Sequence, residues 1–298
     1  MGGLCEDLRA VSPDATRLCT ELMADPLHRL DRAEELRNTY GVEIPFLFTD
    51  FNPATTDDEE TLREVDRFIG ATDARLNAAG ISFGSQDYID QFVRATRTFV
   101  QDELRVHPEK SPTLNAIDTI RAGKGPCVGI DIVYYGIFLL AKLNPMIQFQ
   151  FDESSRPGEL LLHTRLAFSN KEAPQAPLYI VDAAKGVFGQ DVTPEPYVEL
   201  SPAEFIAVTY VNQLRDKTLP LPTQLERINI ALALSQKNSL VQFMALHDAI
   251  GYYDAHQDWT TSGRYLREAV SVNPAGEKVL MEKFPQTASR ILQTTAPR

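Results

Sequence analysis

The stretch GKGPCVGIDIVYYGIFLLAKL, residues 123–143, decides the fold, because it joins a turn-forming start to a long apolar run. Gly123, Gly125 and Pro126 indicate a tight turn, and the apolar residues after them predict a buried central helix packed closely on a sheet. If Pro126 is the first helical residue, Cys127 lies in the first turn. There the helix dipole and the free backbone N–H groups stabilise a thiolate and can bind an oxyanion. Cys127 is therefore a candidate nucleophile.

Two further chemistry-bearing residues follow on segments with the composition of strands. His163 lies in ELLLHTRLAF and Asp182 lies in PLYIVDA, within a region, 145–199, in which the period of the apolar pattern is two. A cysteine at a helix start, then a histidine and an aspartate on successive strands, is the order of a thiol nucleophile, its base and the group that orients the base. The sequence thus predicts a catalytic triad of Cys127, His163 and Asp182.

The register between the two strands decides whether the base meets its orienting group. If Phe168 pairs with Pro177, His163 faces Asp182 directly, and if Phe168 pairs with Leu178, Asp182 turns to the opposite face. The sequence leaves both registers open. It also leaves open a structural interpretation, in which the cysteine is a small buried apolar residue, as lone cysteines commonly are.

The composition is that of a soluble globular protein and narrows the classes of partner. Apolar residues make up 43% and charged residues 23% of the 298 residues, which suffices to bury a large core. The net charge of −12 repels phosphate backbones and anionic lipid, so we expect neither nucleic acid nor a membrane as a partner. We expect no secretory signal, because the first residues lack a basic segment followed by an apolar one.

The cysteines and histidines do not indicate a metal centre. Cys5, Cys19 and Cys127 lack CxxC spacing, which favours free thiols in a reducing compartment, and we expect a cytoplasmic protein. His247 and His256 are interpreted as solvated or capping side chains rather than as metal ligands. Because the sequence contains no Gly-rich phosphate loop, Walker-type lysine or HExxH motif, we predict no cofactor and no metal.

Hydrophobic periodicity divides the chain into three parts. Residues 1–123 carry helical patterns, strand patterns follow, and helices return beyond 200, where Ser201 and Pro202 form a helix start. The segment 240–276 resembles one tetratricopeptide unit, in which small residues let two antiparallel helices approach closely. The residues that support this resemblance are Gly251, Tyr252, Ser262, Leu266, Ala269 and the closing Asn273-Pro274. We expect a domain at 1–200, with its core at 112–200, and a tetratricopeptide-like helical region at 201–298.

The segment from about 112 to 190 resembles the transglutaminase-like branch of the papain-type cysteine enzymes. Gly125-Pro126-Cys127, His163-Thr164 and Val181-Asp182 correspond to the positions of that family's nucleophile, base and orienting residue. The run LNAIDTIRAGKGPCVGIDIVYYGIFLLAKLN, with the tetratricopeptide-like helices downstream, resembles more narrowly the bacterial transglutaminase-like proteins that are fused to such helices. The resemblance implies an α+β fold: a helical N-terminal region, a papain/transglutaminase-like core with a central helix against a small antiparallel sheet, and C-terminal helices.

The resemblance also implies an activity and its alternatives. The expected enzyme transfers an acyl group through Cys127, by amide hydrolysis, deamidation or transamidation, and takes a protein or peptide as substrate. The C-terminal helices are the expected contact surface for that substrate or for a protein partner. The alternative is a non-catalytic protein-interaction module built on a degenerate transglutaminase-like fold. An arylamine acetyltransferase-type enzyme shares the order of the triad but not the long helical N-terminal region.

One departure from the family pattern concerns the base. The narrower group has Pro-Gly directly before its histidine, whereas here Pro157-Gly158 precedes Glu159, and His163 follows four residues later. On a strand those four residues span about 13 Å, at about 3.3 Å per residue, so only one of the two side chains can hold the base position. Gln91 and Asn115 are the candidates for a side-chain oxyanion donor.

Overall fold

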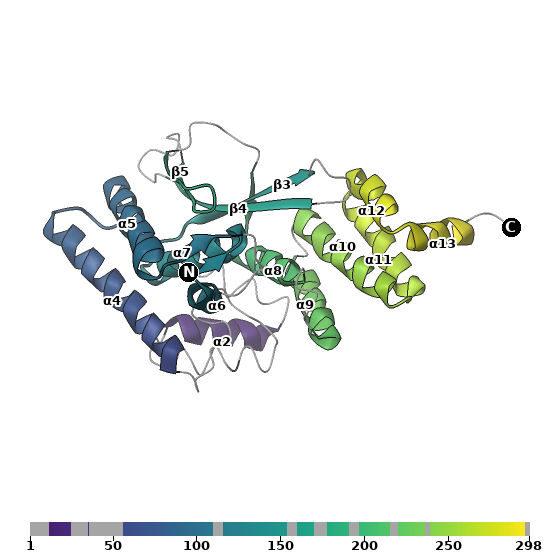
Figure 1. Cartoon of the computed structure of the whole chain (residues 1–298), viewed down its shortest axis with the longest axis horizontal. Helices are drawn as coiled ribbons and strands as arrows, with labels where there is room; N and C mark the ends of the chain where they lie inside the picture. The colour runs from purple at the N-terminus through teal and green to yellow at the C-terminus, as the bar shows by residue number, and fades with distance from the viewer. Residues whose placement is uncertain are drawn as a thin grey trace.

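A helix buried almost all round, α7 (Cys127–Leu140), lies against a five-stranded sheet in the computed structural model, and other helices flank the pair (Figure 1). The combination of helices with one antiparallel sheet confirms the α+β class. The structure describes residues 12–24, 35, 56–109, 116–153, 160–169, 178–190, 197–214, 220–235 and 239–295.

The N-terminal helices follow the predicted helical patterns. They are α2 (Pro13–Ala24), α4 (Thr56–Ala78), α5 (Gln86–Thr98) and α6 (Ala116–Ala122). Gly80 follows the end of α4 with a φ of +73°, the left-handed conformation expected of a glycine that closes a helix. Ser85 caps α5 by accepting a hydrogen bond from the backbone N–H of Tyr88, and the helix runs on into a π-helical turn, η3 (Phe99–Glu103). The helix expected at 26–41 lies outside the described residues, apart from position 35.

The sheet has the strand order β6-β5-β4-β3-β7, and all neighbouring strands are antiparallel. The strands are β3 (Met146–Glu153), β4 (Leu160–Phe168), β5 (Tyr179–Asp182), β6 (Val187–Gln190) and β7 (Val198–Leu200). Strand patterns predicted all of these except β6. β6 is an edge strand with no fully buried residue, so its four residues carry no apolar alternation, and Gly189 interrupts it further. The turn at Gly186, which has a φ of +70°, joins it to β5.

One face of the sheet and α7 share a single hydrophobic core. All residues of α7 from Val128 to Phe138 are buried, which explains why the apolar run shows no amphipathic stripe. The strands contribute apolar side chains at alternate positions to this core. These are Ile147, Phe149, Leu166, Phe168, Tyr179, Val181 and Leu200. The packing places the first residue of α7, Cys127, beside β4, the central strand of the sheet.

The C-terminal helices continue the core and then form a second one. They are α8 (Pro202–Gln213), α9 (Leu221–Leu234), α10 (Ser239–Ala255), α11 (Trp259–Val272), α12 (Glu277–Lys283) and α13 (Pro285–Thr295). Ser201 caps α8 in a capping box with Glu204, and Pro202 is the first helical residue, as predicted. Phe205 of α8 belongs to the core of the sheet, whereas Phe243 and Phe284 belong to a second cluster formed by α10 to α13.

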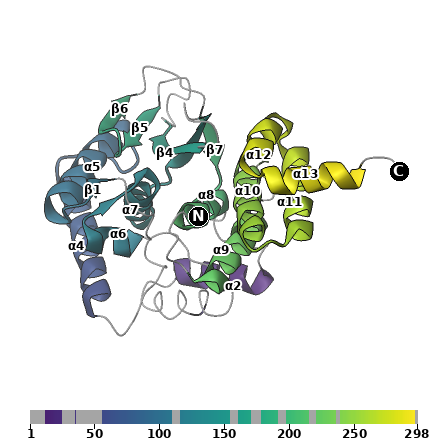
Figure 2. The same cartoon turned by 45° about the vertical axis from the view of Figure 1, so that its right-hand side comes forward.

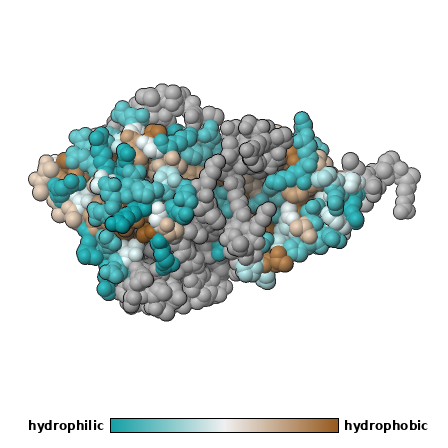
Figure 3. Space-filling model, in the orientation of Figure 1, coloured by the Kyte–Doolittle hydropathy of each residue, from teal (hydrophilic) through white to brown (hydrophobic). Residues whose placement is uncertain are grey.

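The second cluster forms a lobe beside the sheet (Figure 2). Helices α8 and α9 share the first core although they follow residue 200. The domain boundary at residue 200 therefore stays a prediction. The described surface in Figure 3 is largely hydrophilic with scattered apolar residues, in keeping with the net charge of −12. Across the described ranges, no helix has the length and apolar character needed to cross a bilayer.

Candidate active site

Cys127 begins α7 at a position that the preceding turn holds firmly. Two short parallel strands, β1 (His107–Pro108) and β2 (Lys124–Gly125), pair just before the helix, and the backbone N–H of His107 donates to the carbonyl of Gly123 at 3.1 Å. Gly123 has a φ of +66°, a conformation that favours glycine. A side chain at Gly125 would place its Cβ 2.9 Å from a methyl group of Thr119, so the turn also depends on a close approach.

The helix starts one residue later than predicted. Pro126 is the N-cap, with φ −70° and ψ 173°, rather than the first helical residue, and Cys127 is the first residue of the helix. The backbone N–H of Val128 hydrogen-bonds the sulfur of Cys127, as expected for a group at a helix N-terminus. The correction therefore keeps the thiol where the free N–H groups point.

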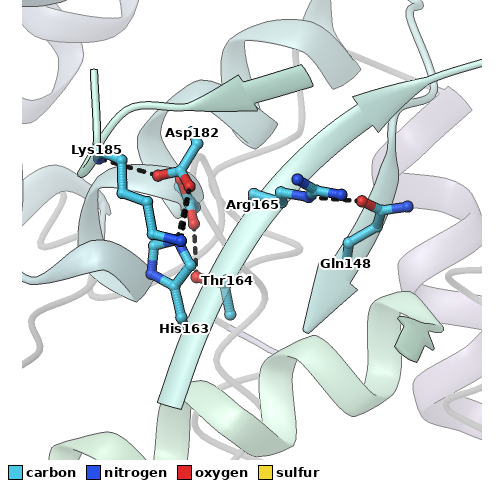
Figure 4. Close-up of polar contacts among 7 residues, drawn as sticks. Gln148, His163, Thr164, Arg165, Asp182 and Lys185 are labelled. Atoms are coloured by element: carbon cyan, nitrogen blue, oxygen red, sulfur yellow. Dashed lines mark hydrogen bonds and ion pairs between the residues drawn. The ribbon is translucent and has the colours of Figure 1, made fainter. Parts of the chain in front are cut away.

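His163 and Asp182 are brought together by β4 and β5. Nε2 of His163 lies 2.7 Å from Oδ2 of Asp182 (Figure 4). The carboxylate is also held from the other side, because its Oδ1 accepts a hydrogen bond from the backbone N–H of Lys185 at 3.0 Å. The side chain of Asp182 is 4% exposed and that of His163 is 18% exposed, so little water competes for the bond between them.

The register that joins these strands is neither of the two considered from the sequence. Phe168 pairs with Tyr179, and the ladder ends at the pair of Leu166 with Val181. His163 and Asp182 are consequently two positions out of direct pairing and lie on the same face. Such diagonal neighbours are about 7–8 Å apart at the backbone, which long polar side chains can span.

Cys127 completes the group through a hydrogen bond with His163. Burial alone would raise the pKa of the thiol, but the hydrogen bond and charge of His163, with backbone N–H groups of Thr164 and Val128, bring it below the ordinary value. Burial also acts against the charge of His163, yet the bonds to Asp182 and Cys127 raise its pKa from 6.5 to about 9. Around neutral pH these directions favour a thiolate–imidazolium ion pair.

His163 lies beside the cysteine. Glu159 falls outside the described residues, as does the Pro157-Gly158 that precedes it. Of the two candidates for a side-chain oxyanion donor, Gln91 is exposed on α5 and Asn115 lies outside the described residues. Besides His163, the donors to the sulfur in the described part of the chain are the backbone N–H groups of Val128 and Thr164.

Sequence reasoning missed a buried carboxyl beside the triad. Asp131, one turn after Cys127 on α7, is 0% exposed, and the hydroxyl of Thr164 donates to its Oδ2 at 2.5 Å. The signal was present in the sequence, since Asp131 is the one acidic residue of an otherwise apolar run. Because buried carboxyl groups rarely lack a partner, the position of Asp131 in this run indicates a polar neighbour elsewhere in the fold.

A second polar group lies next to His163 along β4. The guanidinium of Arg165 donates to Oε1 of Gln148 on β3 at 2.7 Å, as Figure 4 shows, and stacks over the ring of Tyr197 at 3.6 Å from its centre. Alternation along β4 puts Arg165 on the same side of the sheet as His163. The side of the sheet that carries the base is therefore polar near the triad.

The two helical histidines have local roles. Nδ1 of His247 pairs with the carboxylate of Asp248 at 2.9 Å, and Nδ1 of His256 hydrogen-bonds the carbonyl of Tyr252 at 2.6 Å. His247 is buried, so of the two predicted roles, solvated or capping, the solvated one is wrong for it. Within the described ranges, no group of three or more histidine, cysteine, aspartate or glutamate side chains could hold a metal ion.

Comparison of the chain with protein-family models, with curated proteins and with solved structures finds no match.

Proposed function

We propose that the chain is a cysteine-dependent acyl-transfer enzyme of the transglutaminase-like type. The observation that supports this most strongly is the contiguous set of hydrogen bonds from Cys127 to His163 to Asp182 at the start of a buried helix. A merely structural cysteine has no need of a buried histidine–carboxylate pair. Charged groups are seldom buried without a function or a compensating partner, and here each member compensates the next.

The roles of the three side chains follow from the geometry. The thiolate of Cys127 attacks the carbonyl carbon of an amide, and the protonated His163 then gives its proton to the departing amine. Because Nε2 of His163 is bound to Asp182, the other ring nitrogen, Nδ1, is left to face the sulfur. Asp182 holds the ring in that orientation and stabilises its positive charge. Backbone N–H groups at the start of α7 supply positive potential for the oxyanion.

The second half of the reaction releases the acyl group from the thioester. Neutral His163 takes a proton from water or from an amine, the oxygen or nitrogen forms the new bond to the acyl carbon, and the sulfur leaves as a thiolate. Water gives hydrolysis or deamidation, and an amine gives transamidation. The resemblance of residues 112–190 to the transglutaminase-like family supports this class. So does the packing of a central helix that begins with cysteine against an antiparallel sheet.

A protein or peptide is the substrate that we propose, in a cytoplasmic setting. The helical lobe of α10 to α13, beside the sheet, is the surface proposed to contact it. The hairpin of α10 and α11 supports the tetratricopeptide-like interpretation: Ser262 of α11 is fully buried and its hydroxyl bonds the carbonyl of Ile250 of α10 at 3.3 Å. A thiolate nucleophile of this kind requires a reducing compartment to stay free of disulfides.

Acylation by p-nitrophenyl acetate and alkylation by chloroacetamide test the proposal. The wild-type protein should release a burst of p-nitrophenol and carry an acetyl group on Cys127, detected by mass spectrometry. Cys127→Ala should lose the burst, and His163→Gln should slow it by about 10²-fold or more, in the range of a lost general base. An alkylation rate with the pH dependence of an ordinary thiol, equal in wild type and His163→Gln, would contradict the proposal and leave the non-catalytic interaction module as the better interpretation.

A further inference from the structure

Asp131 is the buried group that the proposed mechanism does not use. Its side chain is fully buried, and among the described residues its Oδ1 has no hydrogen-bond partner. In the described part of the chain, the carboxyl accepts one hydrogen bond, from the hydroxyl of Thr164 to its Oδ2 at 2.5 Å. A buried polar atom without a hydrogen-bond partner destabilises a fold. A contribution to stability therefore does not explain why an aspartate occupies this position.

Thr164 connects this carboxyl to the triad. Its side chain bonds Asp131, its backbone N–H bonds the sulfur of Cys127, and its peptide unit is shared with His163. Cys127 and Asp131 are four residues apart on α7, so they lie one above the other on the same side of the helix. The N-terminal part of α7 therefore contacts Thr164 at two points, once from Cys127 and once from Asp131.

We propose that Asp131 is a positioning residue, which through Thr164 fixes the start of α7 against β4 and so keeps Cys127 within hydrogen-bond reach of His163. The inference rests on the proposed function of Cys127 and His163. A shift of the helix along the strand would break the Thr164 bonds and the thiol–imidazole bond together. The close packing of the apolar side chains of α7 also resists such a shift, and the directional hydrogen bonds of Thr164 add a specific position along the strand.

Asp131 carries out this role in its neutral form. Burial, followed by the negative charge of Cys127, raises the pKa of Asp131 well above its usual value, and Asp182 adds to this rise. The bond from Thr164 and the charge of His163 act in the opposite direction but are smaller influences. A protonated carboxyl spares the thiolate a second negative charge one turn away, while its oxygen still accepts from Thr164.

The test is the pH dependence of chloroacetamide alkylation of Cys127 in four variants and one control variant. Thr164→Val and Asp131→Ala should each raise the thiol pKa by about one unit, which slows alkylation about tenfold below that pKa. Thr164→Ser should restore most of the rate, because it keeps the hydroxyl. Asp131→Asn should also restore it, because its amide oxygen accepts from Thr164 and it carries no charge. Thr96→Val, which removes a buried hydroxyl bond on α5, is the matched control and should leave the thiol pKa unchanged.

The outcomes separate this inference from the proposed function. An ordinary thiol pKa in the wild type contradicts the proposed function itself. A lowered pKa in the wild type that is retained in folded Thr164→Val or Asp131→Ala overturns only the positioning role. Faster alkylation of Asp131→Asn at low pH would show that the carboxyl is ionised and would overturn the neutral form. If the single variants do not fold, the double variant Asp131→Val/Thr164→Val replaces both partners by apolar groups, which tends to preserve stability, and should show the same slower alkylation.

Discussion

The substitution Asp182→Asn tests the electrostatic basis of the site most directly. Asparagine keeps the shape of the side chain, and its carbonyl oxygen can still accept from the backbone N–H of Lys185, which lies 3.0 Å from Oδ1. What it removes is the negative charge 2.7 Å from Nε2 of His163. Burial acts to lower the pKa of His163, so without that charge the imidazolium is less strongly favoured.

The structure sets the scale of the effect. Burial lowers the pKa of His163, but the hydrogen bonds and charges of Asp182 and Cys127 outweigh it and raise the pKa from 6.5 to about 9. At about 1.36 kcal/mol per pKa unit, this difference corresponds to about 3 kcal/mol. Asp182 shares this effect with Cys127. We therefore expect Asp182→Asn to reduce the stability of the thiolate–imidazolium pair by about 1–3 kcal/mol, which lowers its equilibrium constant about ten- to a hundredfold.

Two measurements follow this change. Proton NMR of the imidazole, assigned by comparison with His163→Gln, should show that the pKa of His163 in Asp182→Asn falls by about one to two units from its wild-type value of about 9. Alkylation of Cys127 by chloroacetamide should need a correspondingly higher pH. Lys185→Met is the control: its ammonium is 4.0 Å from Oδ2 of Asp182 and half exposed, so its removal should change the pKa little. A His163 that still titrates near pH 9 in Asp182→Asn would refute the electrostatic reasoning.

Three further predictions concern stability. The pKa of His163 is about 9 in the folded protein and 6.5 as the ordinary value, so the stability that its protonation contributes is complete below pH 6.5 and is lost as the pH rises through about 9. The urea midpoint of His163→Gln should therefore fall below that of the wild type at pH 6 and approach it above pH 9. Gly125→Ala, whose Cβ would lie 2.9 Å from a methyl group of Thr119, should destabilise the fold by about 1–3 kcal/mol in urea unfolding and should slow alkylation of the thiol. Gly70→Ala on α4, whose Cβ would have no atom within 4 Å, should instead stabilise the fold by about 0.5–1 kcal/mol in the same measurement. The Cβ of Gly276→Ala would overlap the ring of Phe243, so this variant should lower the thermal stability of the C-terminal lobe and leave the alkylation rate of Cys127 as in the wild type. A slower alkylation rate would contradict the separation of the core of the sheet from the second cluster.

Local chemistry in the sequence accounts for much of the fold. Ser201 and Pro202 start a helix because a hydroxyl and a fixed φ suit any helix N-terminus, whatever surrounds it. Gly80 ends one because only glycine adopts the left-handed conformation without strain. β6 could not be predicted in the same way, because an exposed edge strand acquires its conformation from the partner to which it hydrogen-bonds rather than from its own pattern.

The sequence by itself determined which residues could carry the chemistry: a cysteine at the start of a buried helix, a histidine and an aspartate on strands. Only the tertiary structure decided that they meet. Strand register depends on pairing across the sheet, and it placed Phe168 opposite Tyr179, a pairing that local patterns did not specify. The partner of Asp131 likewise comes from 33 residues away, on β4. Contacts at such separations arise from the packing of α7 on the sheet, which no local signal encodes.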